Sequence, residues 1–138
     1  MTQSFRILSI FILTLFALPS WAEGEEGSAV PQAIYYAISE PFTINFLNQS
    51  KKKARYLQIK VTLKGIDQGA IDGAEQNLPM LQDALLDLFS EQSYEQVSSI
   101  EGRQTLQQDT LETLKSLLKK ETGNDAIDAV YFTNFILQ

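Results

Sequence analysis

The residues of this sequence that could support chemistry are carboxylates and lysines, because the 138-residue chain contains no cysteine and no histidine. The missing histidine removes the usual general base and the commonest transition-metal ligand. Asp83, Asp87 and Glu91 recur four residues apart, and Glu95 extends the series. Such carboxylates can act as an acid and base pair or bind a hard cation. No polar donors, aromatic sugar platform or glycine loop accompany them, so we interpret them as an exposed acidic helix face and expect no catalytic, cofactor or metal site.

Charge also limits the partners that the chain can bind. The formal net charge is −6 and the pI is about 4.6, whereas nucleic-acid binding needs a basic surface, so we expect no nucleic-acid partner. The only basic cluster is Lys51, Lys52, Lys53 and Arg55. It is either a contact for an acidic partner or lipid headgroups, or a solvated hairpin tip, and its position between two predicted strands favours the tip.

The first 22 residues have the pattern of an export signal. Arg6 precedes an apolar stretch over residues 7–18, and Pro19 is followed by the small-x-small triplet that ends at Ala22. We expect cleavage between Ala22 and Glu23. The alternative is an uncleaved anchor, although the 16 residues from 7 to 22 are fewer than the roughly 20 that cross a bilayer core. Residues 23–33, rich in Gly and Glu, predict a flexible acidic linker, which leaves residues 34–138 as one exported domain.

Three apolar patterns predict the strands of this domain. Residues 34–38 and 42–46 are rich in β-branched and aromatic residues and predict two short strands or one bent strand, with Pro41 at a bulge or an edge. Residues 55–64 alternate strictly, which predicts a strand with one buried face and one wet face. The last pattern, residues 130–138, ends the chain.

Leucine-rich patterns between the strands predict two helices. Residues 71–90 repeat apolar side chains every three or four positions, and Pro79 either kinks this helix or begins a second helix capped by Asn77. Residues 93–100 predict a loop. Residues 101–120 predict the other helix, with Gly123 just beyond its end. The leucines of this helix are predicted to share one face, and they are Leu106, Leu111, Leu114, Leu117 and Leu118. The order β-β-α-α-β predicts an α+β fold: a small, mostly antiparallel sheet with two helices packed on one face.

The C-terminal strand is the candidate interface. Strict alternation places Val130, Phe132 and Ile136 on one face and the apolar residues Tyr131, Phe135 and Leu137 on the other. A strand that is apolar on both faces predicts an inner strand. Because the helices cover one face of the sheet, the other face of this strand predicts a contact with another subunit or a partner. That face carries either Tyr131, Phe135 and Leu137 or else Val130, Phe132 and Ile136, and we take the first set as the candidate residues.

Several short motifs in the exported part resemble the FliL family of flagellar basal-body-associated proteins. They lie in this order along residues 34–138: Glu40-Pro41-Phe42-Thr43-Ile44-Asn45-Phe46, Arg55-Tyr56-Leu57-Gln58-Ile59-Lys60-Val61, Leu78-Pro79-Met80-Leu81-Gln82-Asp83-Ala84-Leu85-Leu86, Ser93-Tyr94-Glu95, Glu101-Gly102-Arg103 and Val130-Tyr131-Phe132-Thr133-Asn134-Phe135. The individual motifs have low specificity, whereas the ordered set is fairly specific.

The resemblance implies a non-enzymatic periplasmic domain similar to the stomatin/prohibitin core. It also implies association with the flagellar motor stator in a ring of copies, at the inner membrane, with effects on rotation and chemotactic swimming. Family members usually carry an uncleaved membrane helix, and the short leader with its cleavage-like triplet departs from that pattern. The alternative function is a monomeric periplasmic binding module or scaffold, unrelated to the motor, that takes a peptide from one partner.

Overall fold

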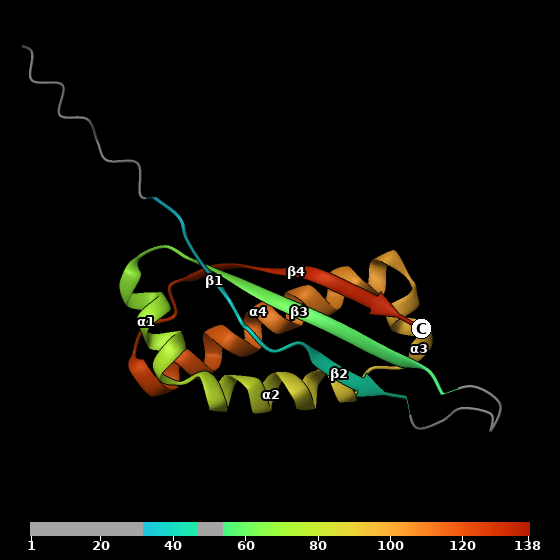
Figure 1. The fold of residues 1–138 in the computed structure, drawn as a ribbon. Coiled ribbons are helices and arrows are strands. Elements are labelled where there is room, and N and C mark those ends of the chain that lie inside the picture. The colour runs from blue at the N-terminus through green and yellow to red at the C-terminus, as the bar shows by residue number, and fades with distance from the viewer. Residues whose placement is uncertain (1–31, 47–53) are drawn as a thin grey trace, which may run out of the picture.

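The computed structural model describes residues 32–46 and 54–138, which form a sheet with helices on one face (Figure 1). The leader, most of the acidic linker and lysines 51–53 lie outside these residues. The strands in chain order are β1 (Ile34–Ala37), β2 (Phe42–Asn45), β3 (Tyr56–Gly65) and β4 (Ile127–Leu137). All the strand pairs are antiparallel, as predicted.

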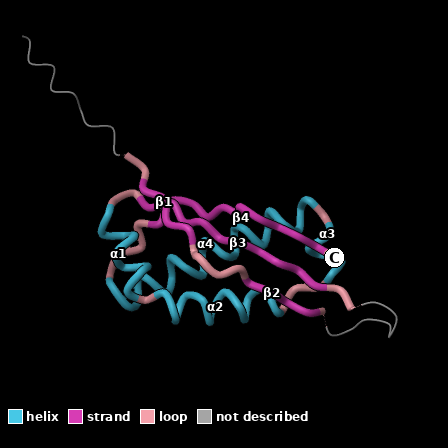
Figure 2. Tube along the Cα trace, in the orientation of Figure 1, coloured by secondary structure: helices cyan, strands magenta, loops and turns pink. Residues whose placement is uncertain are grey.

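The centre of the sheet is β3, not the C-terminal strand. Both β1 and β2 pair with β3 along one of its edges, and β4 pairs with β3 along the other (Figure 2). Within the described residues β4 has no second neighbouring strand, so the prediction of an inner strand at the C-terminus is wrong. The inner strand is the one whose alternation was strictest: Leu57, Ile59, Val61 and Leu63 are completely buried on one face.

A break separates β1 from β2 on their shared edge. Ala37 pairs with Thr62 and Phe42 pairs with Ile59, so four residues of the edge lie opposite two residues of β3. The extra residues include Pro41, which has no N–H to donate to the ladder. The prediction of two short strands or one bent strand, with Pro41 at a bulge or an edge, is confirmed.

Four helices within the described residues connect β3 to β4, two more than the predicted order contains. They are α1 (Gln68–Gln76), α2 (Leu78–Ser90), α3 (Tyr94–Ser98) and α4 (Ile100–Thr122). Pro79 lies in the first turn of α2, so the first predicted helix divides instead of kinking. The predicted loop over residues 93–100 contains α3, because Ser93 and Gln96 cap each other in a reciprocal capping box that sequence reasoning missed.

The long helix α4 begins and ends at residues that suit its termini. Ser99 caps it by accepting a hydrogen bond from the Gly102 amide at 2.9 Å, and Gly123 ends it in the left-handed conformation with φ at 73°. Gly123 donates its amide to the Lys119 carbonyl at 3.0 Å. The prediction that Gly123 lies just beyond the end of this helix is therefore confirmed, and the helix runs to Thr122.

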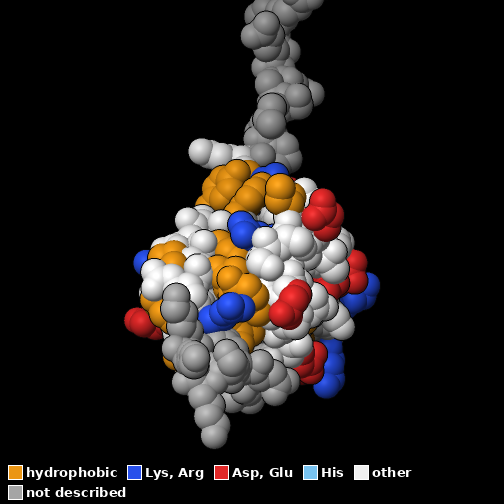
Figure 3. Space-filling model, turned by 90° about the vertical axis from the view of Figure 1, so that its right-hand side faces the viewer, with side chains coloured by type: hydrophobic (Ala, Val, Ile, Leu, Met, Phe, Trp, Pro, Cys, Tyr) orange, Lys and Arg blue, Asp and Glu red, His pale blue; other side chains and the backbone are white. Residues whose placement is uncertain are grey.

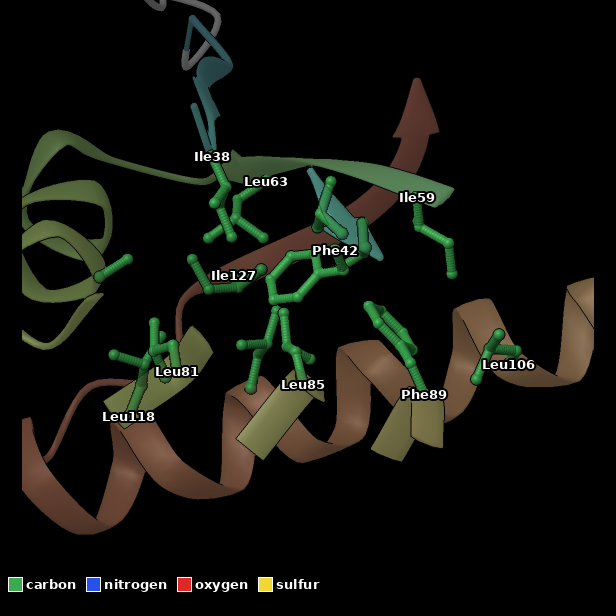
Figure 4. Packing of buried hydrophobic residues seen from close by; sticks show 14 of the residues in the cluster. Ile38, Phe42, Ile59, Leu63, Leu81, Leu85, Phe89, Leu106, Leu118 and Ile127 are labelled. Atoms are coloured by element: carbon green, nitrogen blue, oxygen red, sulfur yellow. The ribbon is translucent and has the colours of Figure 1, made fainter. Parts of the chain in front are cut away.

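The core lies between the helices and one face of the sheet. Figure 4 shows side chains from the strands, including Ile59, Leu63 and Phe42, pointing towards Leu85 and Phe89 of α2. The α4 leucines predicted to share a face are buried at Leu106, Leu114 and Leu118 and half-buried at Leu111 and Leu117. Because all the described helices cover the same face, the α+β prediction is confirmed and the opposite face of the sheet is open.

Candidate interface at the C-terminal strand

The register of β4 changes which of its residues share a face. Asn134 pairs with Lys60 and Phe132 pairs with Val61, so Thr133 is an extra residue that forms a β-bulge. Residues that pair directly in an antiparallel ladder lie on the same face of the sheet. The partners of the four buried β3 residues therefore lie on the core face, and these are Val130, Phe132, Phe135 and Leu137.

The bulge divides the three candidate interface residues between two surfaces. Tyr131 pairs with Thr62 and lies on the open face, with 40% of its surface exposed. Phe135 and Leu137 lie on the core face and are half-buried at its margin. The predicted grouping is wrong because strict alternation fails at Thr133, and Ile136 joins Tyr131 on the open face instead.

Aromatic contacts fix the core face of β4. The Phe132 ring lies edge-on to Phe89 of α2 with 5.9 Å between centroids, and Phe89 lies edge-on to Phe42 at 5.2 Å. Phe135 continues the row, 5.9 Å from Phe132. Edge-to-face pairs in this distance range are favourable arrangements of aromatic rings. The row therefore runs from the buried centre of the domain to the half-buried end of β4.

Hydrogen bonding shows which backbone groups of β4 point away from the sheet. Tyr56 and Gln138 exchange two backbone hydrogen bonds of 2.8 and 3.0 Å. Bonded and non-bonded pairs alternate along an antiparallel ladder, so the next pair, Leu57 with Leu137, is non-bonded. The same alternation makes Phe135 a non-bonded partner of β3. The N–H and C=O groups of Phe135 and Leu137 thus point outward, and we call these groups the free edge of β4.

A glutamine from α4 bonds to an outward-pointing backbone group of β4 that lies nearer the start of the strand than the free edge does. The side chain of Gln107 donates a hydrogen bond to the Val130 carbonyl, which points outward because Val130 also belongs to a non-bonded pair. A pocket of about 230 Å³ lies beside this bond. Its lining residues come from α4 and β4 and are Gln104, Gln107, Gln108, Leu111, Ala129 and Val130. These glutamines were not predicted as site residues, since no pattern in the sequence distinguishes them from surface residues.

An arginine lies over the half-buried end of β4. The guanidinium of Arg103 lies 5.0 Å from the centroid of the Phe135 ring, and its Nε donates to the Val97 carbonyl of α3 at 2.9 Å. The interaction of a cation with an aromatic face is favourable at this distance. Figure 3 views the molecule from the end at which β4 finishes and shows hydrophobic atoms exposed there beside basic side chains, with acidic side chains mainly on the right of the view.

The open face of the sheet carries tyrosines and lysines. Tyr35 is 59% exposed, and its ring centroid is 6.2 Å from that of Tyr131. Lys64 forms an ion pair with Asp128, the extra residue at a second register shift of β4. The hydrogen bond to Asp128, followed by the charge of that carboxylate, raises the pKa of Lys64 above its ordinary value of 10.5. This face is therefore polar and partly basic, unlike the core face.

The acidic row forms no candidate site. Asp83, Asp87, Glu91 and Glu95 are all exposed, the first two on α2 and Glu95 on α3. Within the described ranges, no three or more acidic, cysteine or histidine side chains lie together in a way that could hold a metal ion. The arrangement fits the interpretation of these residues as a solvated acidic face.

The one described member of the basic cluster contacts an aromatic ring. The Arg55 guanidinium lies 4.1 Å from the centroid of the Tyr94 ring, and Phe46 packs edge-on to the same ring at 5.8 Å. This part of the cluster therefore helps to join the sheet to α3. None of the helices in the described ranges is long and apolar enough to cross a membrane.

Comparisons with known proteins identify the family to which the chain belongs. The family model described as flagellar basal body-associated protein FliL matches residues 35–138. The flagellar protein FliL of Aquifex aeolicus is 25% identical over 105 residues, which are 76% of this chain and 62% of that protein. The flagellar protein FliL of Escherichia coli K12 is 29% identical over 109 residues, 79% of this chain and 68% of that protein.

The family match covers most of the chain and all of its described strands but the first residue of β1. The chain therefore belongs to the FliL family of flagellar basal-body-associated proteins, and the predicted resemblance is confirmed. The matched part spans less than two thirds of the Aquifex protein.

Proposed function

We propose that this chain is a non-enzymatic protein of the flagellar basal body that associates with the motor stator and influences flagellar rotation and chemotactic swimming. The observation that carries the proposal is the family match over residues 35–138. The surfaces support it, because the described residues offer an open sheet face and a free strand edge rather than a cluster of catalytic groups. Surfaces of this kind are typical of sites that contact other proteins rather than of catalytic sites.

The proposal places residues 34–138 in the periplasm, at the outer side of the inner membrane. Residues 1–22 serve as a cleaved leader or as a short anchor, and residues 23–33 as the linker to the domain. N-terminal sequencing of the protein from cells tests this arrangement. A start at Glu23 indicates cleavage and a peripherally held protein, and an intact N-terminus in the membrane fraction indicates an anchor. Recovery from the cytosol would contradict both.

The proposal includes self-association, with several copies arranged in a ring around a stator. Its support is the incomplete cover of Tyr131 on the open face and of Phe135 and Leu137 at the margin of the core face, which another molecule could complete. Because the bulge separates these residues, two variants can test the open face and the edge independently. Tyr131→Asp changes the open face, and Leu137→Asp changes the margin next to the free edge.

Swimming and self-association of these variants form the test. We expect that at least one variant loses self-association and swims poorly, with its fold retained by circular dichroism. Phe135→Asp is the stronger perturbation, and Phe135→Leu is its matched control because leucine keeps the apolar contact with the core. Variants that stay folded, no longer associate and still swim normally would contradict a role for assembly through β4.

The pocket beside Val130 favours one alternative. A monomeric periplasmic module could bind an extended peptide along β4 and place one side chain in the 230 Å³ pocket lined by Gln104, Gln107 and Leu111. Gln107→Ala removes the pocket wall and the hydrogen bond to Val130. This alternative would be supported over the ring if the parent chain captures a single basal-body partner and the Gln107→Ala variant does not. Both chains should then be monomeric.

A further inference from the structure

We infer that two copies of this chain join through the free edge of β4, as two antiparallel strands that pair about a two-fold axis at Ile136. The inference rests on the self-association part of the proposed function and specifies the backbone groups that make the contact. Its basis is the set of N–H and C=O groups at Phe135 and Leu137, which point away from β3 and have no partner among the described residues.

The bulge fixes the register of the pairing. A two-fold axis at Ile136 pairs Leu137 of one copy with Phe135 of the other, and Phe135 with Leu137. Each pair exchanges two hydrogen bonds, which gives four backbone hydrogen bonds in total. A register moved towards Phe132 would bring the extra residue Thr133 into the contact and interrupt the ladder. The regular part of the edge therefore allows this register and disfavours registers that are moved towards the bulge.

The side chains agree with this register. Phe135 and Leu137 both lie on the core face of their own sheet, and directly paired residues of two joined strands also share a face. The half-buried Phe135 ring of one copy would thus contact Leu137 of the other copy and complete the cover of both. Cross-strand pairs of an aromatic and an aliphatic residue are among those that stabilise sheets.

The distribution of charge favours a second copy at this edge. The chain carries a net charge of −6, and α1 and α2 contain the acids Asp72, Glu75, Asp83 and Asp87 without any lysine or arginine. Copies that met through these helices would repel each other. Residues 130–138 contain no lysine, arginine, aspartate or glutamate. Natural edge strands that avoid pairing usually carry lysine, proline, an inward charge or a β-bulge, and residues 134–138, which follow the bulge at Thr133, have none of these.

Pairing with the opposite edge of a second copy is less suitable. Both β4 and the β1–β2 edge run antiparallel to β3, so sheets repeated side by side would bring them together as parallel strands. Parallel pairs are slightly less stable per residue than antiparallel pairs. The β1–β2 edge is also interrupted at Pro41. A two-fold contact joins only two copies, so a ring would also require a second contact surface on each copy.

Amide hydrogen exchange, measured by NMR on the chain as isolated from cells, tests the inference residue by residue. We expect that raising the protein concentration slows exchange at the amides of Phe135 and Leu137. The amides of Asn134 and Ile136 should not change, because both already bond to β3 in the single copy. Association observed by sedimentation while Phe135 and Leu137 exchange as fast as before would overturn the edge pairing and leave the proposed self-association intact. Absence of association at every concentration would overturn both.

A proline substitution supplies the matched test. Leu137→Pro removes an N–H that points outward and keeps an apolar side chain, and it leaves the bonds of Ile136 and Gln138 to β3 in place. Two hydrogen bonds of the symmetric contact are lost, so we expect self-association to weaken about tenfold or more. Leu137→Ala, which keeps the N–H, should retain more of the association than Leu137→Pro. Equal association of the proline variant and the parent would contradict the inference.

Discussion

Replacing Gly102 by alanine should destabilise the domain, although alanine normally favours a helix. Gly102 lies in the first turn of α4, where a Cβ would lie 1.9 Å from the Gln96 carbonyl oxygen and 2.8 Å from Ser99 Oγ. The carbonyl belongs to the backbone of α3 and accepts hydrogen bonds from Ser99, so it cannot move without opening the joint between α3 and α4. The clash is thus with a fixed group rather than with a flexible side chain.

The magnitude follows from two opposing effects. Alanine is favoured over glycine in a helix interior by up to about 1 kcal/mol. Forcing an extra methyl into a packed site costs about 1–3 kcal/mol, and loss of the Ser99 cap adds about 1 kcal/mol. We therefore expect Gly102→Ala to lower the free energy of unfolding by about 1–3 kcal/mol. The joint also holds Arg103 over Phe135, so the same substitution should disturb the end of β4.

Urea unfolding with a second glycine as the control tests this reasoning. At Gly73, on α1, the nearest atom to a Cβ would be Thr122 Cγ2 at 3.6 Å, which is an ordinary contact. Gly73→Ala should therefore raise the free energy of unfolding by up to about 1 kcal/mol. The two alanine variants should move the urea midpoint in opposite directions. If Gly102→Ala were as stable as Gly73→Ala, the close approach of α3 and α4 would be refuted.

Three further variants test the core, the open face and the acidic row. Phe89→Ala should cost about 3–5 kcal/mol in urea unfolding, because the ring is completely buried, and a cost below about 1 kcal/mol would contradict the packing. Lys64→Met removes the ion pair with Asp128. Because this pair raises the pKa of Lys64 above 10.5, its contribution to the free energy of unfolding should be fully present below pH 10.5. The contribution should be lost as the pH rises through the higher pKa of the folded state. A stability difference between parent and Lys64→Met that persists unchanged at higher pH would count against the pair. Asp83→Asn with Asp87→Asn should change stability by no more than about 0.5 kcal/mol and leave swimming unaffected, and a folded variant that cannot swim would give this row a function.

Patterns that depend on one element were predictable from the sequence. The alternation of β3 identified its buried face because the helices cover that face and water covers the other. The spacing of the α4 leucines gave the correct helix and face, and Gly123 gave its end because only glycine adopts a positive φ at no steric cost. Each of these signals is local, so no knowledge of neighbouring elements was needed.

Features that depend on pairing were not predictable by strict alternation. From Val130 onward, the apolar residues of β4 that face the core have spacings of two, three and two, and the step of three between Phe132 and Phe135 marks the bulge at Thr133. An alternation pattern with one bulge places Phe132 and Phe135 on one face of the strand and Tyr131 and Ile136 on the other. The strand would then have been amphipathic, as an edge strand of a sheet with one covered face should be.

Salt provides a way to distinguish contacts at the free edge from contacts that depend on charge. The acids of α1 and α2 lie on the helical side of the domain, whereas Lys60, Lys64 and the Tyr131 ring lie on the open face of the sheet. A contact between the acidic side of one copy and the basic face of another would weaken as added salt reduces the screening length from about 10 Å at 0.1 M to about 3 Å at 1 M. Backbone hydrogen bonds and apolar contacts at Phe135 and Leu137 have no such dependence. Self-association that survives 1 M salt would therefore support the edge, and association lost at that concentration would point to the charged faces instead.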